Sequence, residues 1–238
     1  MAVNELSLII PAHNEDKRIL HTLNVYTKFF GDLINKLEIL VVCNNCSDAT
    51  PEIVADFSKK HKEVRAINIL ERIGKGGAVI AGLKEAKHKY CGFIDADDAF
   101  ELEDLKKLIK ALDDSDVAIA SKWKEKNFLQ VREPFIRKIL SRGWNFLVKS
   151  ALDLDFSDTQ AGAKFFTKNA FDSIDQNFLC KGFEFDVELL WKFKKKKFKI
   201  TEVPARTKHM PGSSFRIKNI IYMFGKLVTL YKLSRKLK

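Results

Sequence analysis

Three aspartates gather in one short segment of the sequence, Asp95-Ala96-Asp97-Asp98. The segment follows the apolar run at residues 90–94, which has the composition of a buried strand. Mg²⁺ and Mn²⁺ bind carboxylate oxygens and keep coordination positions open for substrate phosphates. Acidic turns after strands are common, so the motif alone is weak support for a metal site. Its position at the carboxyl end of a strand strengthens that interpretation.

A second candidate is the glycine-rich turn Gly74-Lys75-Gly76-Gly77. It follows an apolar run at residues 64–70 and precedes a segment with helical spacing, so its backbone N–H groups and the Lys75 ammonium are placed to meet a diphosphate. The turn lacks the Gly-Lys-Ser/Thr of a P-loop and the spacing of the dinucleotide fingerprint. A structural glycine turn with a solvated lysine explains this segment equally well.

Both turns belong to an alternation of short apolar runs with segments of helical spacing. The expected strands are residues 6–10, 37–42, 64–70, 90–94 and 117–120, and the expected helices are residues 16–30, 51–60, 77–89 and 102–112. This alternation predicts an α/β fold of Rossmann type, with a mostly parallel sheet and helices on both faces. Ligands of such sheets bind beyond the carboxyl ends of the strands, so we expect the site in the loops after the first four strands.

The pattern changes after residue 121. We expect a helix at residues 134–152, a loop at 153–162, a short strand, a helix at 185–193, a strand at 200–203 and a C-terminal helix. A chain of 238 residues is long enough for one substantial core, which favours a single domain over residues 1–238.

The composition restricts the class of protein. The net charge of +11 attracts nucleic acid, anionic lipid and phosphorylated substrates without choosing among them. Four cysteines are too few for a disulfide scaffold and indicate a reducing compartment, and the polar residues around Cys43 and Cys46 disfavour a redox or zinc site. We find no signal peptide and no run of about 20 apolar residues, so we expect a cytoplasmic protein that is peripheral on a membrane.

The loops resemble the nucleotide-binding half of family 2 glycosyltransferases with the GT-A fold. The motifs are PAHNE at residues 11–15, VCNNCSDAT at 42–50, GKG at 74–76 and DAD at 95–97, and DTQAG at 158–162 and FEFDVELL at 183–190 are similar to dolichyl-phosphate glucose and mannose synthases. The resemblance implies an inverting transfer of a hexose from UDP-glucose or GDP-mannose to a polyisoprenyl phosphate such as dolichyl phosphate. It also implies Mg²⁺ or Mn²⁺ as cofactor.

The resemblance implies roles for individual residues. The nucleotide sugar would contact Pro11, Ala12, Asn14, Glu15, Asn44, Asp48, Lys75, Gly76, Asp95, Ala96 and Arg216. The metal ligands would be Asp95, Asp97 and Gln160; the catalytic residues would be Asp97, Gln160 and Asp186; the acceptor phosphate would meet Arg137, Ser141 and Arg142. Residues 1–121 would then form the nucleotide-sugar-binding half and residues 122–216 the acceptor-binding half, with 209–216 as a loop over the donor.

The chain departs from the family pattern in the loop after the second strand. Cys43 and Asn44 stand where the family often has two carboxylates, so base recognition would rely on amide hydrogen bonds and the base is left open. Lys122 stands where an arginine is often found, and we expect no C-terminal membrane anchor of the kind that many members have.

Transfer to a phosphate requires neutralisation of the leaving diphosphate more than it requires proton transfer, because the acceptor is already ionised. A hydroxyl acceptor on a glycan or glycolipid would instead need a carboxylate base, such as Asp158, Glu184 or Asp186. For Glu184 and Glu188 the structural alternative is a partly exposed acidic helix face that pairs with nearby lysines.

The C-terminal helix at residues 217–238 is basic and amphipathic. Its expected apolar stripe consists of Ile217, Ile220, Ile221, Phe224, Val228 and Tyr231. Such a helix can lie in a bilayer interface, cap a core or form a dimer seam. We favour the membrane surface, because the expected acceptor is a lipid.

Two other classes are alternatives. A sugar nucleotidyltransferase uses a similar sheet and metal but needs a glycine-rich loop after the first strand, and residues 11–15 contain no glycine. A nucleic-acid-binding protein would explain the net charge but leave the clustered aspartates unexplained, so we expect no nucleic-acid partner. The sequence does not indicate an oligomeric state.

Overall fold

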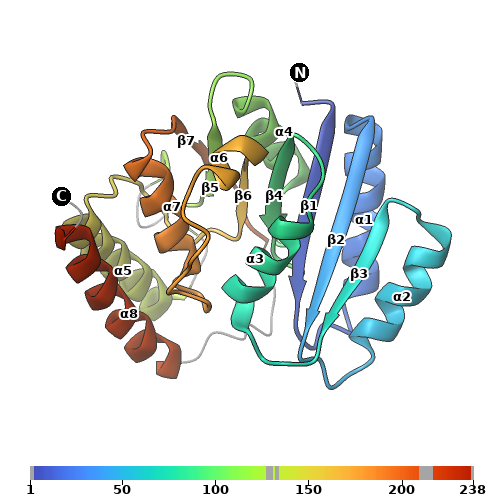
Figure 1. Cartoon of the computed structure of the whole chain (residues 1–238), viewed down its shortest axis with the longest axis horizontal. Coiled ribbons are helices and arrows are strands. Elements are labelled where there is room, and N and C mark those ends of the chain that lie inside the picture. Colours follow the sequence, from blue (N-terminus) through green and yellow to red (C-terminus); the bar gives the residue numbers. More distant parts are fainter. Residues whose placement is uncertain (1–2, 127–130, 132–133, 209–216, 237–238) are drawn as a thin grey trace.

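The computed structural model describes residues 3–126, 131, 134–208 and 217–236, and the side chains of the last helix from residue 222 onward. One seven-stranded sheet with the order β3-β2-β1-β4-β6-β5-β7 runs through the molecule (Figure 1). The strands are β1 (Glu5–Ala12), β2 (Lys36–Asn44), β3 (Val64–Ile69), β4 (Tyr90–Ile94), β5 (Val117–Ser121), β6 (Ala163–Thr167) and β7 (Ile200–Pro204). The predicted α/β class and the mostly parallel sheet are confirmed.

One strand runs against the others. The pairs β1–β2, β1–β4, β2–β3 and β5–β7 are parallel, whereas β6 lies antiparallel between β4 and β5. Gly92 allows the close approach of β6 to β4, since a Cβ there would lie 2.5 Å from the backbone oxygen of Lys164. Because β6 comes from the second half of the chain, both expected halves contribute to one continuous sheet.

Helices cover both faces of the sheet. The first face carries α1 (Ile19–Leu33), α2 (Thr50–Lys60) and α4 (Leu102–Ala111), and the second carries α3 (Gly74–Glu85), α6 (Lys168–Asp172) and α7 (Phe185–Lys195). Side chains of a strand alternate between the faces, so Leu8 and Ile10 enter the first core and Ile9 the second. The core therefore has two layers, one on each side of the sheet.

Two further helices, α5 (Phe135–Leu152) and α8 (Ile217–Lys236), lie side by side at the end of the molecule that also carries α7 (Figure 1). Val148 and Leu152 of α5 and Leu227 and Leu230 of α8 join the second core. Within the described part of the chain, no helix is both long enough and apolar enough to span a bilayer.

Several element boundaries differ from expectation; α1, for example, spans Ile19–Leu33 where residues 16–30 were expected. Helix α3 begins at Gly74, three residues before the expected start, so the glycine turn forms its first turn. The short helix α6 was not expected; the Thr167 hydroxyl accepts a hydrogen bond from the Ala170 backbone N–H (3.2 Å) and caps it.

Candidate active site

The candidate site lies where β1 and β4 are neighbours. Helix crossovers take the chain from β1 outward to β2 and β3, and then back to β4 on the other side of β1. The loops after these four parallel strands therefore emerge at one edge of the sheet, and the strand order reverses between β1 and β4. Doubly wound sheets bind ligands at such a reversal.

The loops after β1 and β2 are joined by Asn14 and Asp48. Asn14, at φ 58°, accepts a hydrogen bond from the Ser47 backbone N–H (2.8 Å). The Asp48 carboxylate accepts from the backbone N–H of Asp16 (3.1 Å) and from the hydroxyl of Thr50 (2.6 Å). Burial acts to raise the pKa of Asp48, but these hydrogen bonds outweigh it and lower the pKa. Both side chains thus shape the two predicted nucleotide loops.

Asn44 connects the second loop to the glycine turn. Its side-chain oxygen accepts a hydrogen bond from the backbone N–H of Ile73 (3.1 Å), and its backbone oxygen contacts Nδ1 of His13 at 2.8 Å. Asn44 and Ala12 are both buried, whereas Pro11 and Glu15 are partly exposed. A nucleotide would therefore meet Pro11 and Glu15 at the surface of this loop pair.

The nearby C-x-x-C has the properties of a structural pair of thiols. Cys43 and Cys46 are free cysteines, and the Cys46 thiol donates to the backbone oxygen of Ala12 (3.6 Å). Burial, and then the neighbouring Cys46, raise the pKa of Cys43 to about 12. A redox-active cysteine needs a lowered pKa, so the structure also disfavours a redox motif here.

The glycine turn packs against the loop that precedes α7. The N–H groups of Gly76 and Gly77 donate to the backbone oxygens of Gly182 (3.2 Å) and Lys181 (3.1 Å). A Cβ on Gly76 would lie 2.3 Å from the Cβ of Phe185. Close packing on this loop thus already uses these two N–H groups, and the predicted contact of the turn with a diphosphate stays a prediction. Lys75 is the charged side chain that the turn offers.

Lys75 points to the acidic turn. Its ammonium nitrogen lies 2.6 Å from Oδ1 of Asp95, and the side chains are 17% and 33% exposed, so solvent reaches the pair. Burial alone would lower the pKa of Lys75, but the carboxylates of Asp95 and Asp186 outweigh it and raise the pKa. The lysine is thus a permanent positive charge beside the predicted metal ligands.

The acidic turn itself is held by backbone contacts. The Asp95 N–H donates to the backbone oxygen of Gly162 (3.0 Å), the carbonyl of Ala96 accepts from the Thr22 hydroxyl (2.8 Å), and the Ala99 N–H donates to Oδ1 of Asp97 (3.2 Å). Burial, followed by the charge of Asp95, raises the pKa of Asp97. Burial and the charge of Asp95 thus disfavour the ionised form of Asp97, and a bound cation would offset both effects.

The DTQ segment meets the acidic turn through Gly162, which leaves no room for a side chain beside Asp95: a Cβ there would lie 1.9 Å from Oδ2. Two residues earlier, the amide nitrogen of Gln160 donates to the backbone oxygen of Phe183 (3.1 Å), which leaves its amide oxygen as an available ligand. Asp95, Asp97 and Gln160 have side-chain oxygens of the kind that Mg²⁺ and Mn²⁺ prefer, and their role as metal ligands stays a prediction.

The described residues contain no cluster of three His, Cys, Asp or Glu side chains able to hold a metal ion. A metal at this site would therefore need the amide oxygen of Gln160, substrate oxygens or water in addition to the two aspartates. That ligand set fits an ion that carries a substrate diphosphate.

Asp186, the third predicted catalytic residue, lies in a buried ion pair. Its carboxylate is 2.5 Å from the ammonium of Lys164, and both side chains are almost fully buried. The same ammonium donates to the backbone oxygen of Ala161 (2.8 Å), in the DTQAG segment. Lys164 therefore joins α7 to the loop that carries Gln160, a role that sequence spacing alone did not indicate.

Two other acidic residues of the same segment are buried as well. Glu188 accepts hydrogen bonds from the backbone N–H groups of Leu179 and Cys180 and pairs with Lys192 at 3.0 Å. Glu184 accepts from the Gly182 N–H (3.0 Å). The alternative of a partly exposed acidic face is therefore wrong about exposure, although the pairing of Glu188 with a lysine is confirmed.

The predicted acceptor-phosphate residues lie on α5 around Trp123. The indole N–H of this buried tryptophan donates to the Ser141 hydroxyl (3.1 Å), and the Arg142 guanidinium lies 5.2 Å from the ring centroid. Arg137 is exposed one helical turn before Ser141. Trp123 lies two residues after the end of β5, and its position after a strand is the signal that could have found it.

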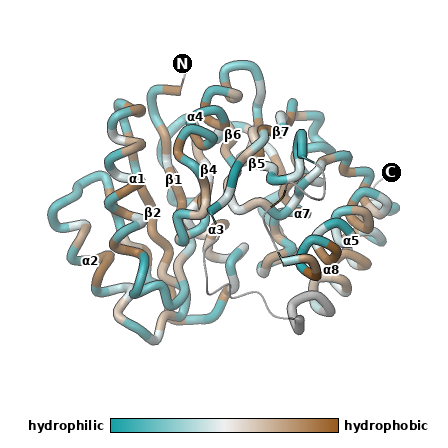
Figure 2. Tube along the Cα trace, turned by 180° about the vertical axis from the view of Figure 1, so that it is seen from behind, coloured by the Kyte–Doolittle hydropathy of each residue, from teal (hydrophilic) through white to brown (hydrophobic). Residues whose placement is uncertain are grey.

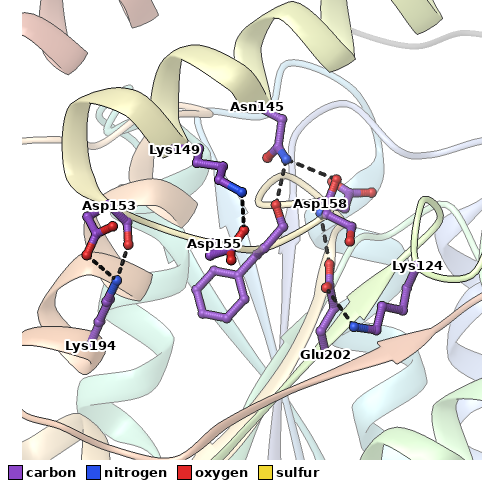
Figure 3. A network of polar contacts seen from close by, with 10 residues as sticks. Lys124, Asn145, Lys149, Asp153, Asp155, Asp158, Lys194 and Glu202 are labelled. Atoms are coloured by element: carbon purple, nitrogen blue, oxygen red, sulfur yellow. Dashed lines mark hydrogen bonds and ion pairs between the residues drawn. The ribbon is translucent and has the colours of Figure 1, made fainter.

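A network links α5 to the DTQ segment (Figure 3). The amide nitrogen of Asn145 donates to the backbone oxygens of Phe156 (2.6 Å) and Ser157 (3.1 Å), and its side-chain oxygen accepts from the Thr159 hydroxyl (3.2 Å). A groove of about 670 Å³ beside this network is lined by Arg142, among others. The acceptor-side helix is thus attached to the segment that carries Gln160.

One predicted site residue and one predicted loop cannot be placed, and one residue of the site was not predicted. Arg216 and the expected loop at 209–216 lie outside the described residues. Arg18, which the sequence analysis missed, pairs with Glu15 three residues before it, and the charge of Asp97 also contributes to its raised pKa. An acidic and a basic residue three apart at a helix start is the signal that could have revealed it.

The sheet reversal, the paired aspartates at the end of β4 and the facing lysine together define a glycosyltransferase of the GT-A class. A sequence model described as glycosyl transferase family 2 matches residues 7–175. The chain belongs to this family, as its motifs indicated.

Named relatives and solved structures agree with this assignment. A dolichyl-phosphate beta-glucosyltransferase of Drosophila melanogaster is 34% identical over 223 residues, which cover 88% of this chain and 68% of that protein. The Homo sapiens protein of the same name is 29% identical over 224 residues, covering 88% and 69%. Glucosyl-3-phosphoglycerate synthase of Mycobacterium tuberculosis, crystallised with Mn²⁺, UDP and phosphoglyceric acid, has a TM-score of 0.69 at 16% identity, covering 98% of this chain and 78% of that chain. This last likeness concerns the fold.

Proposed function

We propose that the protein transfers a hexose, with inversion, from a nucleotide diphosphate sugar to a polyisoprenyl phosphate, dolichyl phosphate being the model acceptor. The observation that carries the proposal is the Lys75–Asp95 pair beside Asp97 at the reversal between β1 and β4. The relatives named dolichyl-phosphate beta-glucosyltransferase support the acceptor class. A glucose donor such as UDP-glucose has more support than GDP-mannose, because these relatives are named glucosyltransferases.

In this proposal the protein's main task is to neutralise the leaving group. Asp95, Asp97 and Gln160 would hold Mg²⁺ or Mn²⁺, which supplies positive charge to the diphosphate when bound. Lys75 can exchange its ion pair with Asp95 for an oxygen of the same diphosphate. A charge-assisted contact of this kind is strongest where the negative charge develops, in the transition state.

The acceptor would be bound by residues of α5. Arg137, Ser141 and Arg142 would bind its phosphate, and Trp123 fixes the orientation of the last two. An oxygen of the acceptor phosphate attacks C1 of the sugar, and the bond from C1 to the diphosphate oxygen breaks with its electron pair. No base is required, because the attacking oxygen already carries a negative charge.

The proposed lipid acceptor also implies where in the cell the enzyme would work. A polyisoprenyl chain lies in a bilayer, so the enzyme would work as a peripheral protein at the cytoplasmic face of a membrane, where nucleotide sugars are available. The reducing compartment indicated by the free cysteines is consistent with this side.

The test is a matrix of donors and metals. The protein is incubated with UDP-glucose or GDP-mannose, a polyprenyl phosphate, and Mg²⁺ or Mn²⁺, and release of nucleoside diphosphate is followed. Asp97→Ala should abolish metal-dependent turnover and leave the circular dichroism spectrum unchanged. Full activity of this variant would remove Asp97 from the mechanism, and transfer to a glycan hydroxyl but not to the lipid phosphate would favour the hydroxyl-acceptor alternative.

A further inference from the structure

A charged side chain lies inside the central sheet. Lys164 stands in the middle of β6, opposite Phe93 of β4, and is 0% exposed. Figure 2 shows the central strands of the sheet as mainly hydrophobic. The Lys164 ammonium lies 2.5 Å from Oδ1 of Asp186 and 2.8 Å from the backbone oxygen of Ala161, and 5.6 Å from the centroid of the Phe93 ring. Protein groups, and not solvent, therefore satisfy this charge.

Stability does not explain why this position carries a charge. The cost of taking an ammonium and a carboxylate out of water often exceeds their attraction, so a well-packed apolar pair is commonly as stable or more stable. The next two residues of β6, Phe165 and Phe166, are fully buried. The strand can thus carry large apolar side chains, and a buried ion pair here needs a reason connected with the site.

Residues 160–162 connect three parts of that site. The amide nitrogen of the first residue, Gln160, donates to the backbone oxygen of Phe183 in the loop before α7 (3.1 Å). The backbone oxygen of the middle residue accepts from Lys164, and that of the last residue accepts from the N–H of Asp95 in the acidic turn (3.0 Å). The position of the segment therefore decides where Gln160 lies relative to the predicted metal ligands.

The ion pair fixes this segment to α7. Asp186 lies in the first turn of the helix, three residues after Phe183, so the hydrogen bond from Gln160 and the ion pair of Lys164 link the segment to the start of α7 at two points. Loss of the ion pair would remove one of these points. Partners of this kind, which hold metal ligands in place without binding the metal, strongly affect metal affinity and activity in enzymes.

Asp186 also acts on Lys75. Burial alone would lower the pKa of Lys75, and the charges of Asp95 and then Asp186 outweigh it and raise the pKa. Lys75 thus lies between two carboxylates, one paired with Lys164 and one in the acidic turn. Without Lys164, the unpaired charge of Asp186 would attract Lys75 and compete with a diphosphate for it.

The surroundings of Asp186 do not suit a direct part in proton transfer. Its side chain is 3% exposed, and its Oδ1 is already paired with the ammonium of Lys164. A general base must come within about 2.6–3.2 Å of the atom whose proton it removes. A carboxylate that is enclosed and paired in this way suits a supporting role.

We infer that Lys164 and Asp186 are positioning residues of the donor site. Their ion pair holds residues 160–162 against α7, so that Gln160 stays beside the acidic turn, and it leaves the charge of Lys75 to the donor diphosphate. The pair itself neither touches substrate nor transfers a proton. The inference rests on the proposed function and deepens it, since it separates the residues that meet the donor from the pair that supports them.

The main test is the double variant Lys164→Met with Asp186→Leu, which removes both charges and fills the space with apolar groups. In urea unfolding it should recover stability relative to Lys164→Met alone. Its turnover, measured as release of nucleoside diphosphate per folded molecule, should still fall by on the order of 10- to 100-fold, and the half-saturating Mn²⁺ concentration should rise by a similar factor. A return of wild-type turnover together with stability would overturn the inference.

Asp186→Asn is the second variant, because an amide of the same shape disturbs the packing less and still accepts a hydrogen bond from Lys164. It should lower turnover and raise the half-saturating Mn²⁺ concentration, while the pH profile of turnover keeps its shape. Two results would overturn the inference. Loss of an ionisation from that profile would mean that Asp186 takes a proton, and wild-type turnover with unchanged Mn²⁺ dependence would mean that its charge is not needed.

Lys192→Met is the matched control. Lys192 is also a buried lysine, 7% exposed, and pairs with Glu188 at 3.0 Å on the same helix. Its backbone contacts are at residues 175–177, away from residues 160–162. The control should lose stability as Lys164→Met does, yet each folded molecule should keep wild-type turnover and Mn²⁺ dependence. An equal loss of turnover in the control would contradict a specific role for the first pair.

A binding arm separates the inference from the proposed function. The affinities of UDP and GDP in the presence of Mn²⁺ are measured by isothermal titration calorimetry, which needs no acceptor. If wild type transfers sugar to no acceptor, the proposed function fails and binding decides on the pair. Affinity about tenfold or more weaker in the double variant than in wild type supports the positioning role, and equal affinity overturns it. If wild type binds neither nucleotide, both proposals fail.

Discussion

Gly162→Ala tests the site with the addition of one methyl group and no change in charge. The new Cβ would lie 1.9 Å from Oδ2 of Asp95 and 2.4 Å from its Cγ, whereas ordinary contact begins at about 3.4 Å. The carboxylate must therefore move by about 1.5 Å from the position in which it pairs with Lys75 and is predicted to bind the metal. A misplacement of about 1 Å in a catalytic group costs on the order of 100-fold in rate, so we expect at least that loss in turnover.

The assay is release of nucleoside diphosphate under saturating donor, together with a Mn²⁺ titration of the rate. Asp95 is one-third exposed and can swing into solvent, so the melting temperature should change little. Gly31→Ala on α1 is the matched control, because a Cβ there meets nothing within 4 Å. It should keep full activity and gain about 0.5–1 kcal/mol of stability from helix propensity.

The reasoning would be refuted by a Gly162→Ala protein with wild-type turnover and an unchanged Mn²⁺ dependence. That result would mean that the carboxylate of Asp95 is not needed where the structure places it. A large loss of stability together with activity would point instead to a role in folding, and thermal unfolding separates the two outcomes.

Three further predictions concern charges. Lys75→Met should weaken binding of the nucleoside diphosphate by about tenfold or more, as measured by isothermal titration calorimetry, since it removes a charge-assisted contact. Hydrogen bonds from Arg206 outweigh burial and lower the pKa of Asp104 from 3.8 to about 2, so this carboxylate stabilises the fold above pH 3.8 and loses its effect as pH falls towards 2. Asp104→Asn should therefore cost roughly 1–2 kcal/mol at pH 7, after allowance for solvent screening, and flatten the pH dependence of unfolding in that window. Lys164→Met should destabilise by about 3–5 kcal/mol in urea unfolding, because it leaves Asp186 buried and unpaired, and Lys164→Met combined with Asp186→Leu should recover part of the loss.

Those parts of the fold that depend on a local pattern of apolar residues were predictable from the sequence. Each of the first five strands is a short apolar run, and the burial of β4 on both faces explains why its run does not alternate. The position of β6 was not predictable in this way. Its antiparallel pairing between β4 and β5 depends on contacts between residues far apart in the sequence, such as Gly92 with Phe165.

The site was predictable in its residue types but not in its pairings. The acidic turn and Lys75 were each recognisable from spacing, yet their 2.6 Å contact joins two separate loops. The buried pair of Lys164 with Asp186 was missed, because a lysine in a strand and an aspartate on a helix are each usually exposed. The apolar stripe of α8 was recognised, but only packing decides which face of a helix turns inward.

Asn145 gives the acceptor helix a mechanical connection to the reaction centre. Its side chain forms hydrogen bonds with three of the four residues at 156–159, namely Phe156, Ser157 and Thr159, immediately before Gln160. Any displacement of α5 would therefore be passed on through Asn145 to the segment that carries Gln160.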